Sequence, residues 1–172
     1  MRIEPIVPGS RPELAALEAQ IVAERGRISP LYQVLLHSPP LAHGWEQMLS
    51  AVRNRNSLPA GLRELLILRV AVLNDAPYEF EAHVPHALQA GVAQQTIAAM
   101  REQPLPAQLA LSEAERAALD YADAMTGAIA VPDALFARVR QHYQGQQLVD
   151  LTATVAAYNM VSRFLEALQI GH

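Results

Sequence analysis

The chain has no cysteine among its 172 residues, and this absence excludes several kinds of chemistry. Without thiols it forms no disulfide, offers no thiolate ligand to zinc and cannot run a thiol-based reaction by itself. Charged residues make up only 17% of the chain, and the net charge of -4 comes with no basic cluster. Nucleic-acid binding is therefore not expected.

Long hydrophobic runs are also missing. No uninterrupted apolar run reaches the roughly 18 residues that a membrane-spanning helix needs, and residues 1–5 show no apolar signal segment. We therefore expect a cytoplasmic protein with no membrane partner. Hydrophobic residues nevertheless form 51% of the chain, which is a high share for a soluble monomer. Burial of this surplus between subunits would give a homo-oligomer.

Apolar residues recur at helical spacing along most of the chain, and no segment alternates as a strand does. The sequence therefore predicts an all-α fold. The expected helices, with a connector over 27–39 and short helices over 93–101, span 12–24, 39–54, 59–73, 78–90, 112–127, 132–143 and 147–168. We expect residues 1–39 to form an N-terminal helix and connector arm and residues 40–172 a helical domain, in a single domain overall.

Two pairs of short segments are alike and suggest an internal helical-hairpin repeat. Residues 62–65 resemble residues 148–151, and residues 87–91 resemble residues 167–171. The two offsets differ, so a duplication would also require an insertion or a deletion. Chance similarity between helices rich in alanine and leucine is the alternative.

Ionisable residues stand beside the most apolar segments. In a helix, Glu79, His83 and His86 fall at i, i+4 and i+7, on a stripe that borders the core face. If the helices before and after residues 75–76 pack antiparallel, Glu64 lies within one or two turns of both histidines. A carboxylate beside a neutral imidazole makes a competent acid/base pair.

Two other interpretations of this stripe stay open. Glu79 and His83 could form an exposed i,i+4 pair on a solvated face, which the residues alone favour. Glu79, His83 and His86 could instead ligate zinc or iron, although their spacing is unspecific. Glu64 does not suit a solvated face, because its own helix is apolar on every side. Its carboxylate must be paired, protonated or facing a cavity.

At these residues the chain resembles the carboxymuconolactone decarboxylase family, which includes the alkyl hydroperoxidase D-like proteins. The matching residues are Leu62-Arg63-Glu64-Leu65 through Leu73, then Tyr78-Glu79-Phe80 with His83, Ala87 and Gly91. They lie within residues 40–101, and the tail is similar to a longer, cysteine-less subgroup. The resemblance implies an alkyl hydroperoxidase D-like helical bundle that forms trimers or hexamers, and we expect the homo-oligomer to be a dimer, trimer or hexamer.

In the peroxidase branch of this family, two cysteines in a C-x-x-C arrangement work with an upstream glutamate and a downstream histidine. Matched position by position, the cysteines fall on Ala76 and Glu79, the glutamate on Glu64 and the histidine on His83. A peroxide cannot be reduced through a sulfenic acid and a disulfide without these thiols. Antioxidant activity of the alkylhydroperoxidase or peroxiredoxin type is therefore disfavoured.

The decarboxylase branch implies cofactor-free acid/base chemistry: decarboxylation or isomerisation of a small unsaturated carboxylic acid or lactone. The predicted catalytic residues of such a carboxy-lyase are His83, which would reprotonate carbon, with Glu64 and Glu79, which would orient it. The residues predicted to bind the substrate are Tyr78, His86, Arg53 and Arg69. No cofactor or metal is predicted. A non-catalytic oligomeric binding or scaffold protein of the same fold is the alternative.

Overall fold

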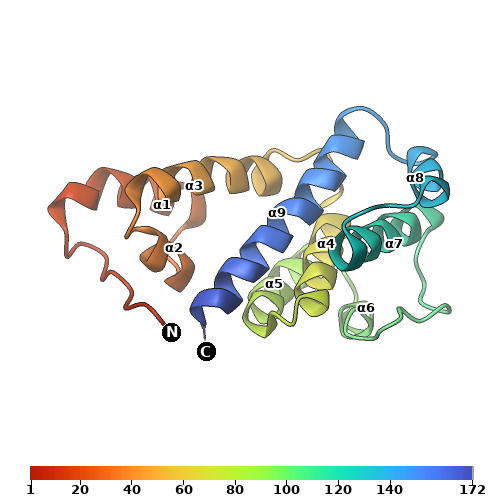
Figure 1. Cartoon of the computed structure of the whole chain (residues 1–172), viewed down its shortest axis with the longest axis horizontal. Coiled ribbons are helices and arrows are strands. Elements are labelled where there is room, and N and C mark those ends of the chain that lie inside the picture. The colour runs from red at the N-terminus through yellow and green to blue at the C-terminus, as the bar shows by residue number, and fades with distance from the viewer. Residues whose placement is uncertain (172) are drawn as a thin grey trace. The chain divides into compact units, whose positions relative to one another are not determined.

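The structure, a computed structural model, describes residues 1–171, and every regular element in this range is a helix (Figure 1). The prediction of an all-α fold is confirmed. The elements are η1 (Pro12–Leu14), α1 (Ala15–Arg25), α2 (Pro30–Leu35), α3 (Pro39–Asn54), α4 (Ala60–Leu73), α5 (Pro77–Gln89), α6 (Gln94–Ala99), α7 (Glu113–Ala128), α8 (Asp133–Arg140) and α9 (Gln146–Leu168). Within the described range no helix has both the length and the apolar character needed to cross a membrane.

The chain divides into two compact units. Among the described residues, unit 1 comprises Met1–Arg55 with residues 165–171, and unit 2 comprises Asn56–Phe164. The first boundary follows α3, later than residue 39, where the sequence analysis ended the N-terminal arm. Helix α3 packs against α1 and α2 and lies with them in unit 1, and the predicted bounds of the arm and the domain stay a prediction. His172, the last residue of the predicted domain 40–172, lies outside the described residues.

A buried ion pair joins helices of unit 1. Arg25 Nε on α1 lies 3.1 Å from Glu46 Oε1 on α3, and Ser50 Oγ donates a hydrogen bond to the same oxygen. The Arg25 guanidinium also lies 5.8 Å from the ring centroid of Tyr32 on α2. Because Glu46 is almost fully buried, its charge requires such partners.

Helix α4 is the central helix of unit 2. It packs against both α5 and α7 (Figure 1), and Leu66, Ile67 and Leu68 on successive sides of it are all 0% exposed. Burying each such side chain contributes about 2 kcal/mol. The sequence makes α4 apolar all round, and the fold surrounds it accordingly.

A tight turn joins α4 to α5. Asn74 follows the last residue of α4, and Asp75 has a φ of 50°, a left-handed conformation that aspartate adopts more readily than most residues. Pro77 then occupies the first position of α5, where a missing N–H costs nothing. Helix α5 therefore begins one residue before the predicted start at Tyr78.

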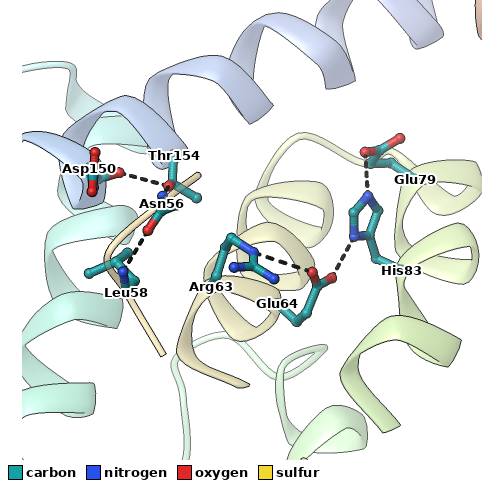
Figure 2. Close-up of polar contacts among 8 residues, drawn as sticks. All are labelled: Asn56, Leu58, Arg63, Glu64, Glu79, His83, Asp150 and Thr154. Carbon is teal, nitrogen blue, oxygen red and sulfur yellow. Dashed lines mark hydrogen bonds and ion pairs between the residues drawn. The ribbon is translucent and has the colours of Figure 1, made fainter. Parts of the chain in front are cut away.

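The segment leading into α4 is fixed to α9 by side-chain hydrogen bonds (Figure 2). Asn56 Nδ2 donates to Thr154 Oγ1 at 2.9 Å, and Asn56 Oδ1 accepts from the backbone N–H of Leu58 at 2.7 Å. Asp150 Oδ2 accepts from the backbone N–H and the hydroxyl of Ser57 at 2.8 and 2.6 Å. Burial acts to raise the pKa of Asp150, but these hydrogen bonds outweigh it and lower that pKa.

The structure does not contain the duplicated hairpin within residues 1–171. Both segments of the second copy lie on, or directly after, the single continuous helix α9, whereas those of the first copy lie on α4 and α5. The segments are alike because they mark helix ends. Gly91 and Gly171, with φ of 84° and 87°, each follow the last turn of a helix, where glycine adopts the left-handed conformation freely.

Arg69 on α4 is 1% exposed and joins three parts of unit 2. Its Nε and Nη2 donate to the two carboxylate oxygens of Asp123 on α7, at 2.6 and 2.7 Å. Its Nη1 donates to the carbonyl oxygens of Met100 and Glu102, at 3.0 and 2.7 Å. A guanidinium has five N–H groups, and most of them are already used here. These contacts give Arg69 a structural role, and its predicted contact with a substrate stays a prediction.

Replacing Asp123 by alanine would leave the Arg69 charge buried without its partner. We expect Asp123→Ala to lower the free energy of unfolding by about 3 kcal/mol, as removal of one partner of a buried ion pair does. Asp123→Asn, which keeps the shape and one acceptor oxygen, should cost less. Urea unfolding of the three proteins measures both changes. A loss below about 1 kcal/mol in Asp123→Ala, typical of an exposed pair, would contradict this account.

Candidate functional site

Helices α4 and α5 bring Glu64 and His83 together inside unit 2. His83 Nδ1 lies 2.7 Å from Glu64 Oε2, and the two residues are only 2% and 5% exposed, with Glu64 the more buried. The antiparallel packing of the two helices predicted this proximity, and the structure confirms it. A short contact between a buried carboxylate and an imidazole is a charge-assisted hydrogen bond when the ring is protonated.

Glu79 approaches the other side of the same ring. Its Oε1 lies 3.2 Å from His83 Nε2, four residues away on α5. Figure 2 shows the imidazole held between the two carboxylates. Because Glu79 and His83 are both buried, the interpretation of an exposed pair, which the sequence alone favoured, is wrong. Glu79 and His83 lie close enough to the core face of α5 to be buried. Glu64 supplies the second partner that the buried ring of His83 requires.

Arg63 extends this set to a row of four charged groups. Its Nε lies 3.7 Å from Glu64 Oε1, and Figure 2 shows the contacts running from Arg63 to Glu64, His83 and Glu79 in turn. When His83 is protonated, the two positive and two negative charges of this charged row cancel. When His83 is neutral, one negative charge remains. The protonation of one ring therefore decides the net charge of the row.

The surroundings of His83 favour its protonated form. Burial lowers the pKa of His83, but the hydrogen bonds and attraction from Glu64 and Glu79 outweigh it and raise that pKa above the ordinary 6.5. An imidazolium can donate an N–H to each carboxylate, whereas a neutral ring can donate only one. The arrangement can therefore hold a proton on His83 and take it back after releasing it.

Two further rings lie beside the imidazole. Tyr158 of α9 meets it edge-on, with ring centroids 5.2 Å apart and an interplanar angle of 88°. The ring centroid of His86 lies 5.5 Å from that of His83, and His86 is exposed. The predicted stripe of Glu79, His83 and His86 therefore has two buried members and one at the surface. Tyr158 is not among the residues predicted from the sequence. In the sequence, Tyr158 stands out only as a tyrosine on a largely apolar helix, and this feature is too common to indicate a functional site.

The other predicted substrate-binding residues lie in different surroundings. Tyr78 is half-buried in the first turn of α5, directly before Glu79. Arg53 lies in the last turn of α3 in unit 1, where its charge acts on Tyr32. For Tyr78, Arg53 and His86, contact with a substrate stays a prediction.

The side-chain geometry gives no support to the metal interpretation. Among residues 1–171, no group of three or more acidic or histidine side chains is arranged to hold a metal ion. Both ring nitrogens of His83 already face carboxylates, so neither is directed toward an open coordination position. The cluster is better described as a proton-holding site.

Protonation of His83 makes the stability of the chain depend on pH. Because its folded-state pKa is raised above 6.5, its contribution is fully present below pH 6.5 and is lost as the pH rises through the folded-state value. We expect the unfolding free energy to fall more over this window in the wild type than in His83→Gln, whose amide does not titrate. Urea unfolding of both proteins across pH measures this difference. The contributions of the other histidines are the same in both proteins and cancel. An NMR titration that places this pKa at or below 6.5 would contradict the prediction.

The solved structures that this one resembles share its fold at low sequence identity. A protein described as an alkylhydroperoxidase AhpD core, an uncharacterized peroxidase-related protein from Ralstonia eutropha JMP134, has a TM-score of 0.83 and 18% identity over 98% of this chain and 90% of that chain. A cysteine-to-alanine variant of the debrominase Bmp8, in complex with 2,3,4-tribromopyrrole, has a TM-score of 0.82 and 18% identity over 99% of this chain and 90% of that chain. A protein of unknown function from Agrobacterium tumefaciens has a TM-score of 0.74 and 23% identity over 81% of this chain and 94% of that chain.

Sequence comparison gives the same relationship. No curated protein sequence matches the chain, but the sequence model of the carboxymuconolactone decarboxylase family matches residues 39–124. This segment is half of the chain, runs from α3 into α7 and contains the whole charged row. The resemblance stated from residues 40–101 is confirmed, and the chain belongs to the carboxymuconolactone decarboxylase family.

Proposed function

We propose that this chain is a cofactor-free acid/base enzyme that decarboxylates or isomerises a small unsaturated carboxylic acid or lactone. The observation that carries the proposal is His83, a buried imidazole with a carboxylate at each ring nitrogen and a raised pKa. Perturbed ionisable groups of this kind are concentrated at functional sites. Membership of a family whose name includes a decarboxylase supports the reaction class.

In the proposed reaction, His83 supplies the proton and the substrate accepts the electrons. In a decarboxylation, the bond to the carboxylate breaks, its electron pair enters the conjugated carbonyl system and carbon dioxide leaves. His83 then donates a proton to carbon, and the solvent restores that proton, so one proton is consumed in each turnover. In an isomerisation, neutral His83 takes a proton from one carbon and returns it to another carbon, so no proton is consumed.

The two carboxylates have different roles in this proposal. Glu64 contacts Nδ1 at 2.7 Å from inside α4, so it fixes the ring and stabilises its positive charge. Glu79 makes the longer contact of 3.2 Å, at Nε2. We assign the transferred proton to Nε2, with Glu79 yielding that position when the substrate is bound. Because burial of Glu79 and His83 keeps water away from the pair, it also argues against a non-catalytic scaffold, whose polar row would face solvent.

The direct test of this proposal is His83→Gln, which keeps hydrogen-bonding atoms near the ring position but has no titratable proton. We expect its turnover of a carboxylated unsaturated lactone to fall by about 100- to 10,000-fold, the usual contribution of a general acid. Loss of the lactone's ultraviolet absorbance, together with release of carbon dioxide, measures the rate. His142→Gln, a change at an exposed histidine, is the matched control and should keep wild-type turnover. Retained activity in His83→Gln on a substrate that the wild type converts would remove His83 from the mechanism.

The missing thiols lead to a second expectation. Because no cysteine is present, hydrogen peroxide or an alkyl hydroperoxide should not be reduced at the expense of a dithiol donor. Peroxide consumption with dithiothreitol should therefore equal that of a heat-inactivated sample. Protein-dependent consumption above this blank would restore a peroxidase function and would require a mechanism without thiols.

A further inference from the structure

We propose that Arg63 binds a carboxylate of the substrate, and that it sets the preference of this site for anionic ligands. The inference rests on the proposed function and assigns a role to a residue that was named from the sequence only among those matching the family. It starts from the donors of the Arg63 guanidinium that the fold leaves unused.

Arg63 is largely buried, yet its hydrogen-bonding capacity is not met within residues 1–171. Its side chain is 17% exposed, and its buried Nε has no hydrogen-bond partner. The ion pair with Glu64 spans 3.7 Å, beyond hydrogen-bond distance. A buried donor without an acceptor is unfavourable, so a ligand oxygen placed against it would be bound strongly.

Arg69, six residues later on the same helix, provides an internal comparison. Its side chain is fully buried and donates to two carboxylate oxygens and two carbonyl oxygens of the protein. Unit 2 therefore satisfies one guanidinium of α4 and leaves the other open. Since a guanidinium presents its N–H groups as a planar fork that fits a carboxylate in two-point contact, the open one is suited to that ligand.

The charges around the row restrict where an anion can bind. Glu79 forms the negative end of the row, so an anionic ligand is repelled there, whereas at the other end the charge of Arg63 offsets that of Glu64. Arg63 forms the positive end of the row, next to Glu64 and one residue contact away from the imidazole (Figure 2). For the proposed reaction, the remainder of a small molecule held there has to extend toward His83. The ligand adds one negative charge to the row and thereby favours the imidazolium further.

A carboxylate that is retained through the reaction is bound about equally in the ground state and the transition state. Loss of such a contact raises KM and leaves kcat nearly unchanged. This effect distinguishes Arg63 from His83, whose replacement acts on kcat. It also allows the role of Arg63 to be tested by binding alone, independently of turnover.

The experiment compares two probes of the same shape, furan-2-carboxylate and its neutral analogue furan-2-carboxamide. NMR titration of the full-length protein gives both Kd values and follows the ring protons of His83. We expect the wild type to bind the carboxylate about 10- to 100-fold more tightly than the amide, as charge-assisted hydrogen bonds allow. Arg63→Gln should abolish this preference while keeping affinity for the amide, and Arg63→Lys should retain part of it.

Arg140→Gln, which removes an exposed arginine of α8 in the same unit, is the matched control and should keep the wild-type preference. In the wild type the carboxylate should raise the pKa of His83 further, and in Arg63→Gln it should not. Equal binding of the two probes by the wild type, or an unchanged preference in Arg63→Gln, would overturn the proposal. An equal loss in Arg140→Gln would do the same, since it would show a general charge effect. None of these outcomes depends on turnover, so the failure of Arg63 and the failure of the proposed function are distinguishable.

Discussion

The carboxylate of Glu64 is the constraint on which the rest of unit 2 depends. It lies on a helix that is apolar on every side and is packed against α5 and α7. A charge in such a place is unfavourable unless a partner of opposite charge or a hydrogen-bond donor reaches it. His83 can reach it only if α5 returns antiparallel to α4 at one register, which the short turn at Asp75 and Pro77 provides. The contact between Glu64 and His83 therefore requires the same register of α5 against α4 that the packing of the two helices requires.

Two sets of contacts outside the site hold α4 in the position that this pairing needs. The segment before α4 is fixed to α9 through Asn56 and Asp150, and the later part of α4 is fixed to α7 through Arg69. Each set satisfies polar groups that would otherwise be buried without partners. The helix carrying Glu64 is thus restrained near both ends, while the imidazole is restrained by carboxylates on both sides. Such restraint keeps the imidazole in one orientation, as the proposed proton transfer requires.

The elements of the fold follow from local sequence signals, whereas part of the site does not. Helical periodicity, the prolines that begin helices and the glycines that end them predict nearly every helix, although α8 ends at Arg140, before the predicted residue 143. The Glu64–His83 contact follows from spacing and an antiparallel turn. The burial of Glu79 does not, because i,i+4 spacing is identical for exposed and covered pairs. The role of Arg69 was also out of reach, since its acceptors lie on segments distant in the sequence.

The alternation of charge along the row from Arg63 to Glu79 has a consequence for how ligands arrive. With His83 protonated, the row has no net charge, so its field falls off with distance faster than that of a single ion. Such a site exerts little long-range attraction, and salt should change the encounter rate of a small anion only slightly. A ligand would then be recognised only at contact distance, where it interacts with each charged group of the row individually. For the anionic substrate proposed above, selection would then depend on residence time rather than on capture from a distance.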